Sequence, residues 1–185
     1  SWGSNTYGSL GLNQPTGARV SSPTQVPGSW SNVEVGFYGG LGVKTSGGLF
    51  TWGYDSDGQL GLGPGGGNKS SPTQVGSDTT WAAVSSYLYG NIATKTDGTL
   101  WSWGLNEHGQ LGVNDKTNRS SPIQVGTDTT WGNLNAAVSR YGVNAIKTDG
   151  TLWAWGNNTN GGMGGTPSRS SPIQIPGTTW KEIAI

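Results

Sequence analysis

The residues that could do chemistry in this chain are few and scattered. His108 is the only histidine and there is no cysteine, so neither a zinc site nor a thiolate nucleophile has its ligands. Asp55–Gly58 begins like a calcium loop, but the later bidentate glutamate is absent and the pattern occurs once. No Ser/His/Asp set and no phosphate-binding glycine loop between a strand and a helix can be assembled. We therefore expect no catalytic residue, no metal, no cofactor and no enzymatic activity.

Two recurring sets of side chains are candidates for binding instead. In one set a tyrosine lies six residues before a Lys-Thr pair, and in the other a basic residue lies three or four residues before the proline of a Ser-Pro pair. Tyrosines on rigid loops supply contact area at low entropic cost, and recognition surfaces are rich in them. The predicted binding residues are Tyr38, Tyr89, Tyr141, Arg19, Lys69, Arg119 and Arg169.

Both sets also have structural interpretations, which the sequence leaves open. Each tyrosine ring could shield its own loop, with the hydroxyl hydrogen-bonded to the backbone. Each basic side chain could serve solubility, or it could pair locally with Asp57, Asp115 or a turn carbonyl. In either case the residues recur because the local structure recurs, and the binding role is the alternative that needs a partner.

The strands that must position these residues follow one local pattern, which is clearest in the middle of the chain. Asp97-Gly98 lies between two alternating segments and predicts a two-residue type I′ hairpin, because both central residues of that turn need φ > 0. In the strand that follows, Trp101 and Trp103 have the same parity and share one face. Asn106 comes three residues after Trp103, and its side chain is expected to cap the next turn by accepting backbone N–H groups.

The pattern recurs with a period of about fifty residues, which is typical of a repeat protein. Trp-Gly steps begin at 2, 52, 103 and 155, Ser-Pro prolines lie at 23, 72, 122 and 172, and a third landmark tryptophan lies at 30, 81, 131 and 180. Each full unit offers four short strands, the last of them starting at the Ser-Pro proline, which we expect at a strand's first residue or an edge. The predicted units are 30–80, 81–130 and 131–179, preceded by the C-terminal part of a unit at 1–29 and followed by the start of another at 180–185.

Most other conspicuous residues are expected to be structural. The ten tryptophans recur at strand positions, which favours packing between repeats over stacking on carbohydrate. Turn caps are predicted at Asn5, Asp55, Asn106 and Asn158. The variable position two residues after each cap is expected to be solvated surface, and it holds Tyr7, Asp57, His108 and Asn160.

Composition excludes several classes of partner. Ten basic and ten acidic residues give a formal net charge of zero, so we expect no nucleic acid and no anionic membrane as partner. No apolar run approaches the roughly 20 residues of a membrane-spanning helix. Without cysteine the compartment cannot be read from the sequence.

Tandem units of four short strands predict an all-β fold, a β-propeller of four-stranded antiparallel blades. The stretch from Trp103 to Gly112, Trp-Gly-x-Asn-x-x-Gly-Gln-Leu-Gly, resembles the repeat of the regulator of chromosome condensation family, and matching copies cover nearly the whole chain. The resemblance implies a ring of about seven blades, whereas this chain supplies three full units and a split fourth. We therefore expect part of a larger ring, or a chain that associates with another.

The resemblance, the low charge and the missing catalytic set together predict a non-enzymatic binding or structural module. Its loops would be presented to a protein or glycan partner, or would contact the chain's own missing blades or another subunit. Nearly identical Ser/Thr/Asn/Gly-rich repeats are similar to bacterial and viral surface or virion proteins of this family, which favours an extracellular or virion surface. Two further functions remain open: guanine-nucleotide exchange on a small GTPase, and inhibition of an enzyme by a propeller face.

Overall fold

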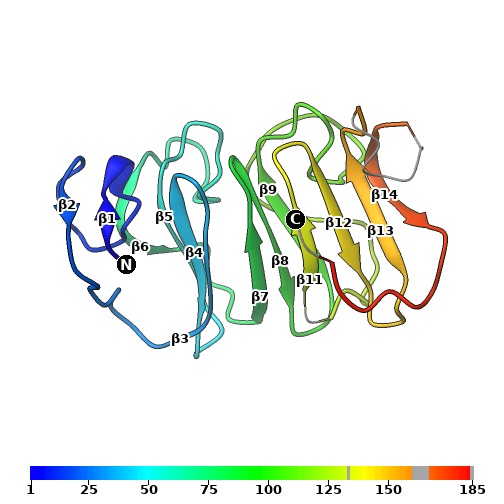
Figure 1. Cartoon of the computed structure of the whole chain (residues 1–185), viewed down its shortest axis with the longest axis horizontal. Coiled ribbons are helices and arrows are strands. Elements are labelled where there is room, and N and C mark those ends of the chain that lie inside the picture. The colour runs from blue at the N-terminus through cyan, green and yellow to red at the C-terminus, as the bar shows by residue number, and fades with distance from the viewer. Residues whose placement is uncertain (133, 160–166, 184–185) are drawn as a thin grey trace.

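The chain folds into three antiparallel four-stranded sheets that stand side by side in a row (Figure 1). The computed structural model describes residues 1–132, 134–159 and 167–183. Within each sheet the spatial order of the strands is their order along the chain, which confirms the predicted all-β fold with four strands per repeat. The strands are β3 (Trp30–Val35), β4 (Gly39–Lys44), β5 (Leu49–Gly53) and β6 (Lys69–Gln74); β7 (Trp81–Ser86), β8 (Gly90–Lys95), β9 (Leu100–Gly104) and β10 (Arg119–Gln124); and β11 (Asn135–Val138), β12 (Gly142–Ile146), β13 (Leu152–Gly156) and β14 (Arg169–Ile175).

A smaller pair of strands precedes the first full sheet. β1 (Gly3–Ser4) and β2 (Arg19–Val20) are antiparallel partners, and the 3-10 turn η1 (Thr6–Gly8) lies between them in the chain. Among the described residues this turn is the one helical element, and no helix there is long and apolar enough to cross a membrane. The division of the chain into repeats at the boundaries given above stays a prediction, and residues 184 and 185 of the last unit lie outside the described residues.

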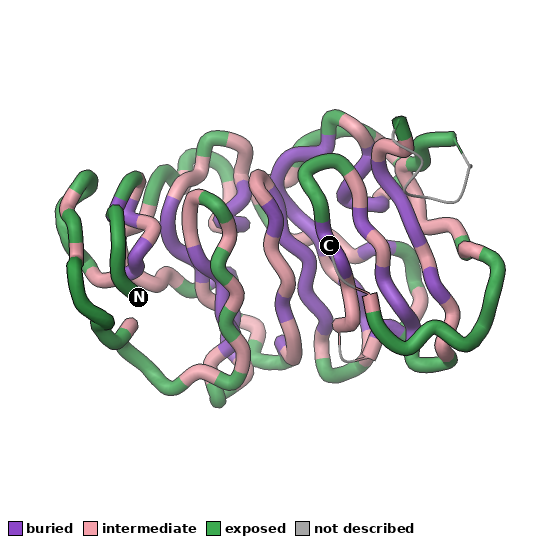
Figure 2. Tube along the Cα trace, in the orientation of Figure 1, coloured by how far each residue is buried: buried purple, intermediate pink, exposed green. Residues whose placement is uncertain are grey.

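Neighbouring sheets pack through their first strands around shared apolar cores. β3 and β4 contact β7, and β7 contacts β11. Leu41 and Leu49 of one sheet share a buried cluster with Trp81 and Val84 of the next. Figure 2 shows buried residues running along the strands, while most of the exposed residues lie in the loops at both ends. The ends of the sheets are therefore the surfaces that the loops decorate.

Buried tryptophans link each sheet to the one before it. Trp103 is fully buried, and its Nε1 donates a 3.0 Å hydrogen bond to the carbonyl of Gln59 in the preceding repeat. Gly61 lies against the same ring with φ +70°, and a Cβ there would come within 2.8 Å of Nε1. Trp155 has the same arrangement against the repeat before it. The predicted burial of both indoles is confirmed, and this contact is the reason that a glycine closes the Gly-Gln-Leu-Gly motif.

Two other aromatic residues in each sheet hold a lysine, in an arrangement that we call the lysine clamp. Lys95 Nζ lies 3.9 Å from the ring centroid of Trp101 and 4.8 Å from that of Trp81. It also pairs with Asp78 Oδ2 at 2.6 Å. Hydrogen bonds from Lys95 and from Thr80 lower the pKa of Asp78 to about 2. The next sheet carries the same clamp, made by Lys147, Trp131, Trp153 and Asp128.

The Asp-Gly hairpins are three-residue turns, so the type I′ prediction is wrong. Gly98 has φ +80° and donates its N–H to Lys95 O at 2.9 Å, whereas Asp97 is not in the positive-φ region. The Asp97 carboxylate accepts hydrogen bonds from the N–H and the hydroxyl of Thr99 at 3.0 and 2.7 Å. These bonds favour an ordinary backbone conformation at Asp97, so the turn is type I followed by a left-handed glycine. Gly150 closes the equivalent turn in the next sheet.

The last strand of each sheet starts earlier than predicted. Lys69 is the first residue of β6, so it lies on the strand and not in the turn before it, and Pro72 lies inside the strand. β6 is an edge strand, and its pairing with β5 shifts register between Thr51 and Gly53. An edge position and an irregular register allow a proline without an N–H to sit inside the strand. The same early start applies to Arg119 in β10 and Arg169 in β14.

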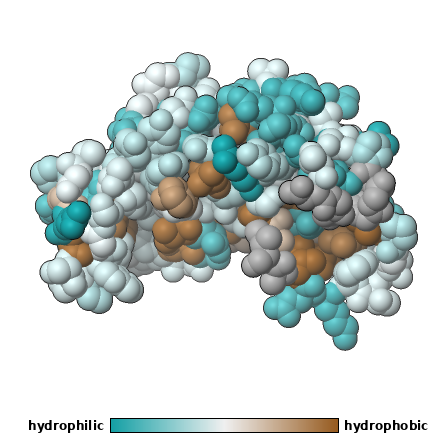
Figure 3. All heavy atoms as spheres, turned by 45° about the horizontal axis from the view of Figure 1, so that its top comes forward, coloured by the Kyte–Doolittle hydropathy of each residue, from teal (hydrophilic) through white to brown (hydrophobic). Residues whose placement is uncertain are grey.

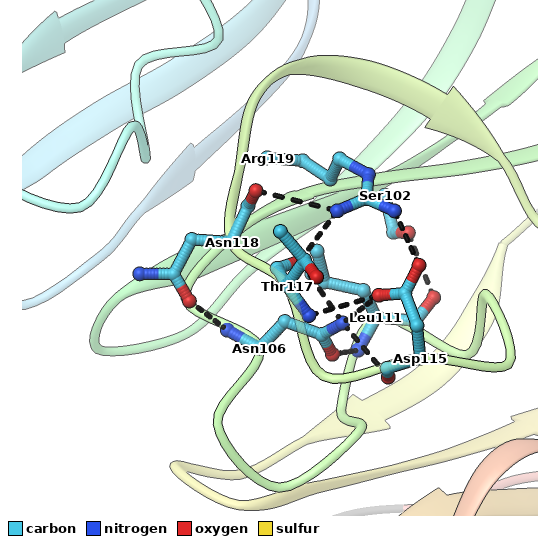
Figure 4. Close-up of polar contacts among 7 residues, drawn as sticks. All are labelled: Ser102, Asn106, Leu111, Asp115, Thr117, Asn118 and Arg119. Atoms are coloured by element: carbon cyan, nitrogen blue, oxygen red, sulfur yellow. Dashed lines mark hydrogen bonds and ion pairs between the residues drawn. The ribbon is translucent and has the colours of Figure 1, made fainter.

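The predicted turn caps are present where the structure describes their side-chain bonds. Asn106 Oδ1 accepts the N–H of Leu111 at 2.9 Å, and its Nδ2 donates to the carbonyls of Asp115 and Thr117 (Figure 4). The side chains of Asn5 and Asp55 accept the equivalent N–H groups at 3.0 and 2.9 Å. These bonds fix the loop that follows the third strand of each repeat.

Candidate binding surface

The three predicted tyrosines lie on loops at one end of the sheets. Tyr38 follows β3, Tyr89 follows β7 and Tyr141 follows β11, which confirms that each lies between the first two strands of its sheet. These loops lie at the upper end in Figure 1. The loops after β5 and β9 reach the same end, because successive strands of an antiparallel sheet reverse direction. Each sheet therefore contributes two loops to one surface.

Tyr38 lies at the centre of a cluster of aromatic rings. Its ring centroid is 5.7 Å from that of Tyr7, 5.5 Å from that of Tyr54 and 6.0 Å from that of Tyr89. Tyr7 and Tyr54 are 4.5 Å apart, and Phe37 packs edge-on against Tyr38 at 4.6 Å. These separations are those of favourable aromatic pairs. Because the rings come from three successive repeats, the tyrosines form one continuous surface.

Arg140 joins Tyr141 to this cluster. Its guanidinium carbon lies 5.0 Å from the ring centroid of Tyr141 and 5.7 Å from that of Tyr89, which is the range of cation–π attraction. Arg140 was not among the predicted binding residues, because the equivalent residues, Phe37 and Leu88, share no residue type with it. The signal that could have found it is its position next to a recurring tyrosine.

At two of the variable positions after the turn caps, the side chain contacts the tyrosine loop of the next repeat. Tyr7 reaches the ring of Tyr38, as described above, and His108 packs edge-on against Tyr141 with centroids 4.9 Å apart. Both side chains are half-buried. The prediction that they are solvated surface residues is therefore wrong. The sequence shows that Tyr7 and His108 occupy equivalent positions in their repeats. Only the packing of the sheets shows that this position lies against a tyrosine loop. Asn160, the fourth residue at this position, lies outside the described residues.

The rings surround a pocket of about 310 Å³ at the junction of the repeats. Four tyrosine rings, two carboxylates and one guanidinium contribute to its walls. The lining residues are Tyr7, Tyr38, Tyr54, Ser56, Asp57, Tyr89, Leu105, Glu107 and Arg140. Together with Phe37, His108 and Tyr141, these residues are called the tyrosine face below.

Parts of the tyrosine face are open to solvent. Phe37 is 72% exposed and Tyr141 is 39% exposed. Burial among the neighbouring rings, and secondly the nearby Tyr89, raises the pKa of the Tyr38 hydroxyl. Figure 3 brings this end forward: its left part is pale, with intermediate hydropathy, and hydrophilic residues gather over its right part.

The predicted basic residues lie apart from the pocket, on the edge strands. Arg119 pairs with Asp115 at 2.5 Å (Figure 4), and Lys69 Nζ donates to the carbonyl of Gly66 at 2.5 Å. Both contacts are local pairings with an aspartate or a turn carbonyl, which is the structural alternative to a binding role. The remaining two, Arg19 and Arg169, are exposed. None of the four lines the pocket, and their role in binding stays a prediction.

The residues of the tyrosine face are suited to binding a partner, and the structure gives no sign of a metal site among the described residues. In that part of the chain no group of three or more His, Cys, Asp or Glu side chains could hold a metal ion. Asp55, where the calcium-like segment begins, uses its carboxylate as a turn cap, and burial raises its pKa. The surface presents aromatic rings and a few charged side chains.

Blades of four antiparallel strands packed side by side, with paired loops at one end, define a β-propeller protein. The profile of the regulator of chromosome condensation (RCC1) repeat matches residues 46–86 and 97–133, and a second profile of the same repeat matches 81–110. These matches lie within residues 46–133, and they confirm the resemblance to the RCC1 repeat that was seen in the sequence.

Known proteins with similar sequence or structure are longer than this chain. The human probable E3 ubiquitin-protein ligase HERC3 is 35% identical over 107 residues, which is 57% of this chain and 9% of HERC3. Human WBSCR16 superposes with a TM-score of 0.73 at 27% identity, covering 93% of this chain and 46% of WBSCR16. Prp20p from Saccharomyces cerevisiae, whose structure was described with its binding to Gsp1p and histones, gives a TM-score of 0.72 at 16% identity. It shares the fold, over 96% of this chain and 46% of Prp20p.

Proposed function

We propose that this chain is a non-enzymatic binding module whose tyrosine face docks a protein partner. The observation that carries the proposal is the continuous cluster of aromatic rings around the pocket, assembled from loops of successive repeats. Interfaces are rich in tyrosine and arginine at their energetic centres, and both types meet here.

The pairing of rings supports binding rather than loop shielding alone. Tyr38 contacts Tyr7 and Tyr89, which belong to other repeats, so the rings hold one another in place. A surface that is already ordered loses little conformational entropy when a partner docks. Phe37 is 72% exposed at the edge of the cluster. An exposed aromatic ring beside other rings adds apolar area to the surface, which favours coverage by a partner.

Similar proteins support a protein as partner. Two structures of the yeast propeller Prp20 (yeast RCC1), which shares this fold, were described with protein partners: Kap60 in one, and Gsp1p and histones in the other. The proteins compared above are human or yeast, and they lend no support to the glycan or virion-surface interpretation. Nucleotide exchange and enzyme inhibition would both be forms of protein binding, and the identity of a captured partner distinguishes them.

Photo-crosslinking tests the proposal at single positions. A benzophenone amino acid is placed at Phe37 on the tyrosine face, and in a control protein at Thr127, which is exposed on the loop after β10 at the opposite end of the sheet. In cells of the source organism we expect a defined crosslinked protein from position 37 and none from position 127. Equal crosslinking from both positions contradicts a docking surface at this end.

Direct binding of the captured, purified partner is the second stage. The triple variant Tyr38→Ser, Tyr89→Ser, Tyr141→Ser should weaken binding by upwards of about 2 kcal/mol, which is the scale of one lost hot-spot aromatic. The control is the variant Thr127→Ala, Glu182→Gln, at exposed positions outside the tyrosine face, and the variant Arg19→Ser, Arg169→Ser tests the basic set separately. If the tyrosine variant binds normally but melts at a lower temperature, the rings serve packing alone and the proposal fails.

A further inference from the structure

The pocket on the tyrosine face combines aromatic rings with unpaired negative charge. Its rings and carboxylates belong to Tyr7, Tyr38, Tyr54, Tyr89, Asp57 and Glu107. Asp57 Oδ2 accepts a hydrogen bond from Ser56 Oγ at 2.8 Å. Among the described residues neither Asp57 nor Glu107 has an ion-pair partner within 4.0 Å. The walls therefore present two carboxylates that form no ion pair with any described lysine or arginine.

A cation suits this lining better than an anion or a neutral group. The face of a tyrosine ring carries partial negative charge and attracts an ammonium or guanidinium group within about 6 Å. Carboxylates add Coulomb attraction and accept hydrogen bonds from the N–H groups of the cation. A sugar could stack on the rings but would leave both carboxylates without a counter-charge.

The protein already holds lysines with the same set of groups. In the lysine clamp, Lys95 lies 3.9 and 4.8 Å from two ring centroids and bonds Asp78 at 2.6 Å. The pocket offers the same two components, ring faces and carboxylates. Arg140 shows that rings of the tyrosine face also accept a cation, since it lies over Tyr89 and Tyr141.

We propose that the tyrosine pocket binds the side-chain ammonium group of a lysine presented by the protein partner. The rings of Tyr7, Tyr38 and Tyr54 receive the alkyl chain and the charge, while Asp57 and Glu107 accept its N–H groups. Arg140 borders the pocket, and its positive charge repels the ammonium group of the lysine. Arg140 therefore limits the affinity of the pocket for that lysine. This inference rests on the proposed function for its partner and adds the kind of side chain that the partner presents.

Titration with small probes tests the pocket without a partner. The probes are Nα-acetyl-lysine methylamide, its Nε-acetylated form, and Nα-acetyl-glutamate methylamide. The readout is the NMR spectrum of the 185-residue chain with ¹³C-labelled tyrosine rings. Tyr87 is buried with its hydroxyl bonded to Leu105 O, so its signal serves as an internal control. We expect the lysine probe to shift the signals of the pocket tyrosines in a saturable way, with Tyr87 unchanged.

Charge variants separate a lysine pocket from an acid-binding one. The variant Asp57→Asn, Glu107→Gln should weaken the lysine probe by at least about threefold and reduce the salt dependence of binding. Glu182→Gln removes an exposed carboxylate outside the pocket and should change neither. Arg140→Gln should strengthen lysine binding, because it removes a like charge from the wall.

Three results would overturn the proposal. One is no shift with the lysine probe, and another is equal binding of the Nε-acetylated probe. The third is stronger binding of the glutamate probe that disappears in Arg140→Gln. These probe results do not depend on the crosslinking experiment, so a failure here removes the lysine and leaves the docking surface, whereas a failed crosslink leaves the probe result standing.

Discussion

At the scale of single residues, the buried caps hold the loops that build the tyrosine face. Asn106 is fully buried, and its side chain satisfies one backbone N–H and two carbonyls of the loop that it closes. A buried amide with this many partners acts as a hub, because removing it leaves several buried polar groups without hydrogen bonds. The cap therefore stabilises the loop whose next residue, Glu107, borders the pocket.

Replacing Asn106 by alanine should lower the free energy of unfolding by about 1–3 kcal/mol. The measurement is chemical denaturation followed by tryptophan fluorescence, with Thr127→Ala as the exposed control, for which we expect a change within about 0.5 kcal/mol. Partner binding should persist in the folded variant. A loss of binding with unchanged stability would instead make Asn106 part of the binding site.

The sequence predicts residues whose role is local and misses those whose role depends on a neighbouring repeat. Asn106 was predictable because a cap and its turn lie within a few residues of one another. Tyr7 and Arg140 were not, because their ring contacts cross from one repeat to another. His108 was expected at the surface for the same reason, since nothing in its own loop indicates Tyr141.

At the scale of elements, the strand pattern was readable but the turns depended on side-chain bonds. The alternation of the second and third strands predicted their pairing, which the structure confirms. The turn at Asp97 differs from the prediction because the carboxylate bonds to Thr99 and holds the backbone out of the left-handed region. Pro72 could enter β6 because the register shifts there, a feature that no residue type announces.

The lysine clamps should make stability depend on acid pH. The pKa of Asp78 is lowered in the folded chain to about 2, against an ordinary value near 3.9 in the unfolded chain. Folding thus favours the ionised carboxylate, so this contribution is complete above about pH 4 and is lost as the pH falls toward 2. Asp128 in the next sheet has the same lowered pKa, caused first by Lys147.

The variant Asp78→Asn, Asp128→Asn tests this contribution. It should be less stable than the native chain at neutral pH, by no more than about 1 kcal/mol per pair because both carboxylates are partly exposed. Its stability should also fall less steeply between pH 4 and 2. Urea denaturation across that range, with Glu182→Gln as control, measures both effects, and parallel curves for native chain and variant would rule the clamps out as acid-sensitive groups.

At the scale of the whole molecule, the contact between repeats determines which loops meet. Trp103 is seated on Gly61 of the preceding repeat and bonded to Gln59, and this seat fixes the spacing of neighbouring sheets. The tyrosine rings of adjacent loops meet only at that spacing. The repeat period could be predicted from the sequence. The angle and separation of the sheets could not, because they depend on how the Trp103 indole packs against the backbone of Gly61.

Gly61→Ala should destabilise the chain more than Gly76→Ala. Both glycines have positive φ, +70° at Gly61 and +61° at Gly76, so each alanine carries a similar backbone cost of about 1 kcal/mol. Only at position 61 would the new Cβ meet the indole of Trp103, whereas position 76 has nothing within 4 Å. The two variants should differ in unfolding free energy by about 1–3 kcal/mol. Equal losses of stability would show that the contact between Trp103 and Gly61 can adjust to an added methyl group.

The seat of the tryptophan also bears on how such a chain can change in length. The joint between one repeat and the next uses the same groups each time: Trp103 with Gly61, and Trp155 with Gly112. Such a joint is heterologous, head to tail, and one repeat presents both of its halves. Unequal crossing-over that duplicates or deletes about fifty codons in register would therefore recreate a working joint at the splice. A gene for this kind of protein can gain or lose whole blades without having to evolve a new interface.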